Sequence, residues 1–301
     1  MSQIGIDMRK IFRTPIFVLL AFASVNSKAQ LVSDSFLIDG HYRSFHFNKP
    51  SSGNSKLSLI FVLHGSGGNG KQIMRGAVKL EEISASENIL LVYPDGYKNY
   101  WNECRKMATS AANVENINDN SFFNQMIEHF VSKYKINSKQ VFVVGTSGGG
   151  HMAYKLAITA PEKFRAITAI IANIPDSSNL DCIEKKHSMP VMIINGTADQ
   201  TNPYDGGEMS VSGTVWGRVR STEQSFKYWA ILDGYKGEPE KEILPDTDPA
   251  DGKTIEKFTY KAKGKPEVVL LKVINGKHDY PNDINVYLEA WNFFKRQINI
   301  Q

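Results

Sequence analysis

The sequence contains few cysteines, no long hydrophobic run and almost no excess of charge. Its 301 residues include only two cysteines, which excludes a small fold built on many disulfides. No apolar stretch approaches the roughly 20 residues of a membrane-spanning helix, so a multi-pass membrane protein is also excluded. The 35 basic residues outnumber the 31 acidic ones, but most of this excess lies in the first 29 residues. The nearly neutral remainder gives no electrostatic case for nucleic-acid binding.

The first 29 residues have the features of a secretory signal peptide. Three basic residues within 9–13 precede a short apolar stretch at 16–23, and small residues occupy the cleavage positions before Gln30. An uncleaved anchor or a buried helix is the alternative interpretation. We expect cleavage before Gln30, export to the periplasm or the medium, and no stable membrane anchor.

Residues 30–301 are predicted to form a single α/β domain with a mainly parallel sheet and helices on both faces. Strands are expected at residues 57–64, 89–93, 140–144, 164–172, 191–194 and 268–274, and helices at 122–134, 148–160, 225–232 and 285–297. This alternation indicates βαβ units. Residues 30–48 are predicted to be an antiparallel pair at the sheet edge. The polar segments 205–222 and 234–265 are expected to form loops or short strands at the top of the sheet, as a partial lid or rim.

A nucleophile is predicted where the strand 140–144 meets the helix 148–160. The sequence Gly145-Thr146-Ser147-Gly148-Gly149 fits G-x-S-x-G, and its strand–turn–helix context is that of a nucleophile elbow. The elbow is strained, so small neighbours are needed on both sides of the serine. The alternative is an ordinary glycine-rich turn. We expect Ser147 to be the nucleophile and the Gly148 N–H to stabilise an oxyanion.

A base and an orienting carboxylate are expected later in the chain, in the order serine, acid, histidine. His278 follows the last predicted strand, in a loop, and is the only histidine with both the order and the setting of a base. Asp199 follows the strand 191–194 and is the candidate acid. Asp205 is its nearest rival, and Asp279 is too close to His278 to orient its imidazole.

The glycine-rich segment 64–70 follows the first central strand. It has the His-Gly-x-Gly-Gly pattern of a first oxyanion loop, and the N–H of Ser66 is the expected second donor. The same segment nearly matches a phosphate-binding loop through Gly65, Gly70 and Lys71. Gln72 stands where that loop needs Ser or Thr for Mg²⁺, so the oxyanion interpretation is favoured.

The two cysteines are predicted to pair, because export implies an oxidising compartment. Cys104 follows the second central strand and Cys182 precedes the strand 191–194. In a cytosolic protein the same pair would instead be two buried thiols. A disulfide requires that their Cα atoms lie within about 7 Å.

Six short motifs in a fixed order carry a family resemblance across nearly all of residues 30–301. They lie at residues 63–69, 93–102, 145–150, 195–204, 245–252 and 278–281. In these motifs the chain resembles the secreted esterases of carbohydrate esterase family 1, which include feruloyl esterases and polyhydroxybutyrate depolymerase-like enzymes. It departs from their pattern at Tyr280, where a tryptophan is usual, and at Gly148, where alanine or asparagine is common.

The resemblance implies an α/β-hydrolase fold and ester hydrolysis through an acyl-enzyme, without metal or organic cofactor. The expected substrates are feruloyl or acetyl esters linked to plant polysaccharide, with polyhydroxybutyrate oligomers as the alternative. Trp101 and Tyr280 are predicted to form the walls of the substrate pocket, because aromatic faces stack on aryl groups and sugars. A serine peptidase of the same fold, or a noncatalytic carbohydrate-binding module, would be the other classes of protein.

Overall fold

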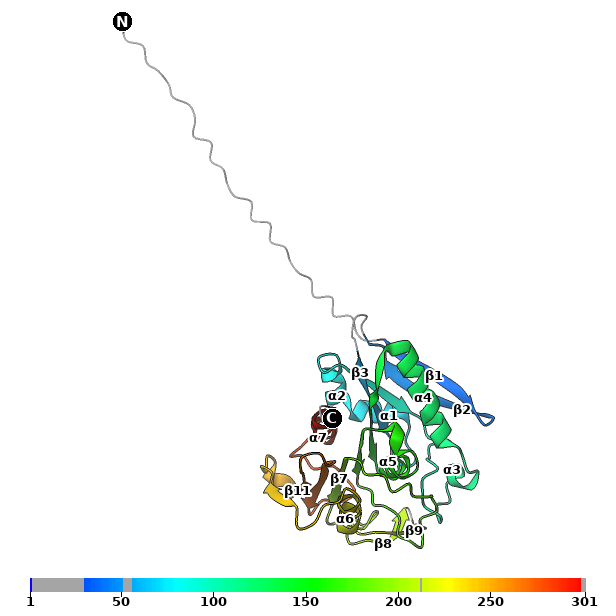
Figure 1. Cartoon of the computed structure of the whole chain (residues 1–301), viewed down its shortest axis with the longest axis vertical. Coiled ribbons are helices and arrows are strands. Elements are labelled where there is room, and N and C mark those ends of the chain that lie inside the picture. Colours follow the sequence, from blue (N-terminus) through cyan, green and yellow to red (C-terminus); the bar gives the residue numbers. More distant parts are fainter. Residues whose placement is uncertain (2–29, 51–55, 212, 299–301) are drawn as a thin grey trace.

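A ten-stranded sheet runs through the molecule (Figure 1). The computed structural model describes Met1 and residues 30–50, 56–211 and 213–298. The strand order is β1-β2-β4-β3-β5-β6-β7-β12-β11-β10. The six central strands, from β4 to β12, are mutually parallel, and the two strands at each edge are antiparallel. Their bounds are β1 Leu31–Ile38, β2 His41–Asn48, β3 Leu57–Leu63, β4 Ile89–Pro94, β5 Ile136–Thr146, β6 Ala166–Ile170, β7 Val191–Gly196, β10 Glu240–Ile243, β11 Thr254–Tyr260 and β12 Val268–Ile274.

Helices cover both faces of this sheet, as the sequence predicts. The apolar side chains of α4, α5 and α6 join one buried cluster with one side of the strands. Those of α1, α2 and α7 pack into a second cluster on the other side. The helices are α1 Gly70–Gly76, α2 Val78–Ser84, α3 Ala111–Val114, α4 Asp119–Tyr134, α5 Gly148–Thr159, α6 Thr222–Leu232 and α7 Val286–Ile298, with short 3₁₀ turns η1 Pro161–Lys163 and η2 Pro249–Asp251. The predicted α/β-hydrolase fold class is confirmed.

The central strands are recognisable in the sequence because they are buried on both faces. β3, β4, β6 and β7 have every residue buried, which is why they read as continuous apolar runs. In a parallel sheet the carboxyl ends of such strands meet along one edge. The residues that follow β3, β5, β7 and β12 are therefore brought together there.

The predicted antiparallel lead-in is confirmed as the pair β1–β2, which joins the sheet through β4. The segment 234–265 forms short strands, one of its two predicted alternatives, but they lie at the edge of the sheet and not at its top. It forms β10 and β11, which extend the sheet beyond β12. Its polar composition reflects an edge strand, since charged side chains keep an exposed edge from pairing with other chains. Two ion pairs link the strands, Lys241 to Glu256 and Lys257 to Glu242.

A separate two-stranded hairpin, β8 Gly207–Val211 with β9 Thr214–Val219, forms the other polar insertion. Val219 makes an isolated bridge to Pro175, and the Trp216 ring stacks on Tyr100 at 6.0 Å. The hairpin therefore lies beside the loop that follows β4.

Residues 2–29 of the predicted signal peptide lie outside the described residues. Among the residues that are described, no helix is long and apolar enough to cross a membrane. Cys104 and Cys182 form a disulfide, with their Cα atoms 5.2 Å apart. This bond ties the loop after β4 to the loop before β7.

Candidate active site

Ser147 lies in a sharp turn between β5 and α5. Its backbone has φ 52° and ψ −117°, a strained conformation that is typical of functional turns. The Ser147 N–H donates to Ile170 O at the end of β6 (2.8 Å), and Ser147 O accepts from His151 N (3.0 Å). A Cβ at Gly145 would collide with the Gly149 carbonyl oxygen. The small neighbours that the elbow motif predicts are therefore required by the close approach of β5 and α5.

Ser147, His278 and Asp199 form an unbroken line of hydrogen bonds. Ser147 Oγ lies 2.9 Å from His278 Nε2, and His278 Nδ1 lies 2.7 Å from Asp199 Oδ2. Because an ionised carboxylate only accepts, Nδ1 carries the proton and Nε2 is free to accept from the serine. This is the tautomer that a general base needs.

The Asp199 carboxylate is held in place by its own loop. Its second oxygen, Oδ1, accepts the backbone N–H groups of Thr201 and Asn202, each at 2.8 Å. The side chain is 1% exposed, whereas the His278 ring is 25% exposed. A buried carboxylate that accepts two backbone hydrogen bonds thus faces a partly exposed imidazole. The rival carboxylates lie elsewhere: Asp205 is exposed, and Asp279 pairs with Lys253 at 3.1 Å.

The base loop is fastened by the segment 245–252. Asp283 Oδ1 accepts the backbone N–H groups of Thr247 (2.6 Å) and Asp248 (3.1 Å). Asn282 Nδ2 donates to Asp248 Oδ2 at 2.7 Å. This motif of the family resemblance thus has a structural function beside His278.

The two predicted oxyanion donors, Ser66 and Gly148, are neighbours in space. A Cβ built on Gly148 would lie 2.9 Å from Ser66 N and 2.5 Å from Ser66 Oγ. A Cβ built on Gly65 would lie 3.4 Å from Ser147 Cβ. The loop after β3 therefore lies against the elbow, with both N–H groups beside the nucleophile.

The oxyanion loop is held in place by hydrogen bonds to the segment that follows β4. His64 Nδ1 donates to Gly65 O (2.7 Å), and Nε2 accepts the Gly96 N–H (2.9 Å). Burial lowers the pKa of His64, which keeps the ring neutral and able to accept at Nε2. Asp95 Oδ1 accepts the Gly70 N–H at 2.7 Å. A carboxylate therefore occupies the start of α1, which argues against the phosphate-loop alternative.

Trp101 belongs to this support and does not line the substrate pocket, so its prediction is wrong. The side chain is 2% exposed. Its Nε1 donates to His64 O at 2.9 Å, and its ring lies against the His64 imidazole with centroids 4.8 Å apart. The indole is large and apolar and carries one donor, so the core beneath the loop satisfies it better than the surface.

Tyr280, the other predicted pocket wall, is half-buried, and its hydroxyl is held by two other hydroxyl groups. Its hydroxyl lies 2.7 Å from Thr146 Oγ1 and 2.9 Å from the Tyr287 hydroxyl. The ring reaches behind the elbow to the residue before Ser147, and burial raises its pKa. Tyr280 connects the base loop to the nucleophile strand.

Tyr100 is the aromatic residue that sequence reasoning missed. Its hydroxyl lies 4.0 Å from the position of a Cβ on Gly67, and the ring is half-buried against Trp216. In an irregular loop no periodicity tells which of two adjacent aromatic residues faces outward. Tyr100, and not Trp101, is therefore the partly exposed aromatic residue beside the oxyanion loop.

The fold and the chain order of the site define an α/β-hydrolase. The chain belongs to the phospholipase/carboxylesterase family, whose model matches residues 49–214. This family and the esterases that the chain resembles support a carboxylic ester hydrolase.

Among relatives, a putative esterase NocK of Nocardia uniformis is 22% identical over 77% of this chain and 68% of its own. A probable feruloyl esterase C of Aspergillus niger is 25% identical over 66% and 73%. The structure of an acetyl xylan esterase from Aspergillus awamori has a TM-score of 0.60 at 17% identity, covering 88% of this chain and 99% of that one.

Proposed function

We propose that this protein is a serine esterase in which Ser147 is the nucleophile, His278 the base and Asp199 the orienting carboxylate. The observation that carries the proposal is the line of hydrogen bonds from Ser147 Oγ through His278 to Asp199. It lies at the carboxyl ends of the parallel strands, where an elbow serine is exposed for attack.

The reaction follows from where the atoms lie. As Ser147 Oγ attacks the ester carbonyl, its proton moves to His278 Nε2, and the N–H groups of Ser66 and Gly148 hold the carbonyl oxygen as it becomes negative. His278 then returns the proton to the departing alcohol, which leaves an acyl group on Ser147. Water attacks this acyl-enzyme by the same route and releases the acid.

For the substrate we propose feruloyl or acetyl esters of plant polysaccharide. Relatives at low identity include feruloyl esterases and acetylxylan esterases, and Tyr100 with Trp216 behind it offers an aromatic surface beside the oxyanion loop. Export through a signal peptide at residues 1–29 accords with this substrate and with the Cys104–Cys182 disulfide.

An ester panel tests the proposal. Methyl ferulate, an aryl acetate, acetylated xylan and hydroxybutyrate oligomers are incubated with the purified protein and with Ser147→Ala, His278→Ala and Asp199→Ala. We expect turnover of the first three substrates, and losses on the order of 10³-fold or more in each variant. Preference for hydroxybutyrate oligomers would assign the alternative substrate class, and normal turnover by Ser147→Ala would refute the mechanism.

A further inference from the structure

We propose that a cavity between α4, α5 and the loop after β4 binds one sugar unit of a polysaccharide. The cavity has a volume of about 310 Å³, enough for about ten water-sized groups and hence for one pentose or hexose ring. Its lining consists of Asp39, Asn102, Asn116, Ile117, Asn118, Asp119, Asn120 and Lys155.

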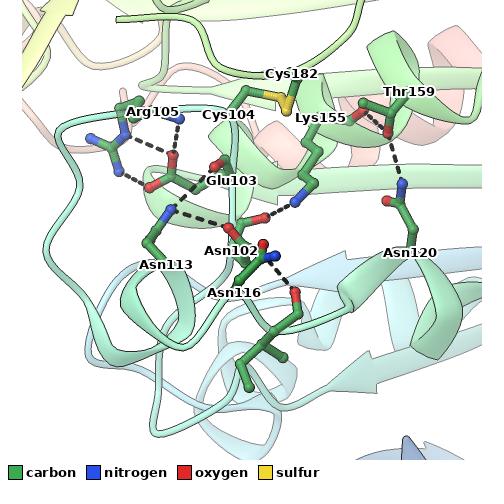
Figure 2. The surroundings of a disulfide bond; sticks show 11 residues. Asn102, Glu103, Cys104, Arg105, Asn113, Asn116, Asn120, Lys155, Thr159 and Cys182 are labelled. Atoms are coloured by element: carbon green, nitrogen blue, oxygen red, sulfur yellow. Dashed lines mark hydrogen bonds and ion pairs between the residues drawn. A yellow bond between two sulfur atoms is a disulfide. The ribbon is translucent and has the colours of Figure 1, made fainter. Parts of the chain in front are cut away.

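Four separate segments line the cavity. Figure 2 shows hydrogen bonds made by Asn102, Asn120 and Lys155, which come from three of these segments. Asn102 Nδ2 donates to Asn116 Oδ1 (3.1 Å) and to Ile117 O (2.8 Å). Asp119 accepts the Asn102 N–H (2.7 Å) and pairs with the buried Arg43 (2.6 Å). The lining side chains are thus oriented before any ligand arrives, which reduces the entropy lost on binding.

Two polar groups of this cavity, Lys155 and Asn120, have few hydrogen-bond partners among the described residues. Lys155 donates to Asn102 O and, among the described residues, makes no ion pair with a carboxylate. Asn120 donates to Thr159 Oγ1, while its Oδ1 is buried without a partner. Burial lowers the pKa of Lys155, as expected where an ammonium group has exchanged water for few other partners. Groups of this kind gain from a ligand that supplies oxygen atoms and hydroxyl protons.

The side chains that line the cavity favour one class of ligand. Side-chain amides both donate and accept, and so do sugar hydroxyls. Ile117 is the single apolar residue of the lining, which disfavours an apolar ligand. An inorganic anion would face Asp39 and Asp119, and a metal cation would face Lys155. A neutral polyhydroxylated ring fits all of these groups.

The cavity is close enough to the ester site to act on the same polymer. Lys155 follows Ser147 by eight residues along α5, which corresponds to about 12 Å of helix. Asn102 directly follows Trp101, which supports the oxyanion loop. This connection to catalysis rests on the proposed function. It would let the enzyme hold a neighbouring sugar of the chain whose ester lies at Ser147.

The test measures binding of unesterified xylotetraose by calorimetry and by amide chemical shifts, and compares three variants. Asn116→Gly removes an amide from the wall and tolerates the local φ of 49°. Lys155→Met removes the ammonium group and keeps an unbranched side chain. Asn88→Gly is the matched control, because Asn88 also has a positive φ of 56° and lies outside the cavity.

We expect xylotetraose to bind, with a loss of about 5-fold in affinity in Asn116→Gly and in Lys155→Met and none in Asn88→Gly. The ratio of kcat/KM on acetylated xylan to that on an aryl acetate should fall by a similar factor in the two cavity variants. The proposal would be overturned if xylotetraose did not bind, or if it bound Asn116→Gly as tightly as the unmodified protein. It would also be overturned if inorganic phosphate, in place of the sugar, shifted the amide resonances of the cavity. Turnover of the aryl acetate by the unmodified protein tests the esterase function separately. If Lys155→Met does not fold, the affinity of Asn116→Gly for xylotetraose alone tests the sugar site, because Asn116 is exposed.

Discussion

At the scale of residues, three hydroxyl groups lie directly behind the nucleophile. Thr146 Oγ1, Tyr280 and Tyr287 contact one another at distances of 2.7, 2.9 and 3.4 Å. Burial raises the pKa of both tyrosines, so they remain protonated donors. Since Tyr280 follows His278 by two residues, the cluster positions the base loop against the strand that ends at Ser147.

Removing the Tyr280 hydroxyl should therefore impair catalysis more than substrate binding. For Tyr280→Phe we expect kcat on an aryl acetate to fall by roughly 3–10-fold with little change in KM, because the hydrogen bonds to Thr146 and Tyr287 are lost. Steady-state kinetics measures both constants. Tyr235→Phe is the control, since its hydroxyl bonds to Pro266 O away from the site. A rise in KM with unchanged kcat would place Tyr280 in the pocket wall instead.

Residue identity was easier to predict than residue placement. The line from Ser147 to Asp199 could be expected because chain order and strand ends constrain where these side chains lie. Trp101 and Tyr280 could not be placed in the same way, because both lie in irregular loops where neither period 2 nor period 3.6 applies. Tertiary packing decided that Tyr100 faces outward and Trp101 inward.

At the scale of elements, the oxyanion loop and the start of α5 approach so closely that position 148 has no room for a side chain. In Gly148→Ala the new Cβ would lie 2.5 Å from Ser66 Oγ and 2.9 Å from Ser66 N. We expect the loop to shift and kcat to fall by about 10-fold or more, the direction seen when an oxyanion donor is displaced. Gly76→Ala is the control, since nothing lies within 4 Å of that position. Equal kcat in the two variants would contradict the proposed donor pair.

The end of α6 should make stability depend on pH. Asp233 follows the helix, and its Oδ1 accepts from Ser188 Oγ (2.6 Å) and Met189 N (3.1 Å). Burial raises its pKa from 3.8 to about 7. A raised carboxyl pKa means that the folded state holds the proton more tightly, so this contribution is full below about pH 4 and is lost as the pH rises to about 7.

Asp233→Asn should therefore flatten the fall in unfolding free energy between pH 4 and 7, measured by urea denaturation at several pH values. Asp205→Asn, at an exposed position, provides the comparison. The same slope in Asp233→Asn and the unmodified protein would contradict this assignment.

The central strands and the helices that cover them could be predicted because burial on both faces leaves a long apolar run. The edge strands β10 and β11 could be predicted only as loops or short strands, since the charges that protect an exposed edge also resemble a loop. The hairpin β8–β9 is likewise predicted from the sequence as loops or short strands at a rim. Its contact with Tyr100 through Trp216 depends on packing that no local pattern encodes.

At the scale of the whole molecule, the disulfide joins loops that are 78 residues apart in the chain. Replacing Cys104 and Cys182 together with serine should lower the unfolding free energy by about 2–4 kcal/mol, because the unfolded chain regains conformational freedom. Urea denaturation with and without a reductant measures the change. A reductant should then affect the unmodified protein and leave the double variant unchanged. Equal stability of the two oxidised proteins would show that the bond does not constrain folding.

The central claim is that Ser147 is an activated nucleophile and that the other serines of the chain are not. Labelling of the intact protein with a fluorophosphonate, followed by peptide mass mapping, tests it most directly, because only a serine paired with a base reacts readily with this probe. The account predicts a single phosphonyl adduct on Ser147, and no adduct in a Ser147→Ala variant whose circular dichroism is unchanged. An unlabelled protein, or an adduct on another serine that persists in Ser147→Ala, would contradict it.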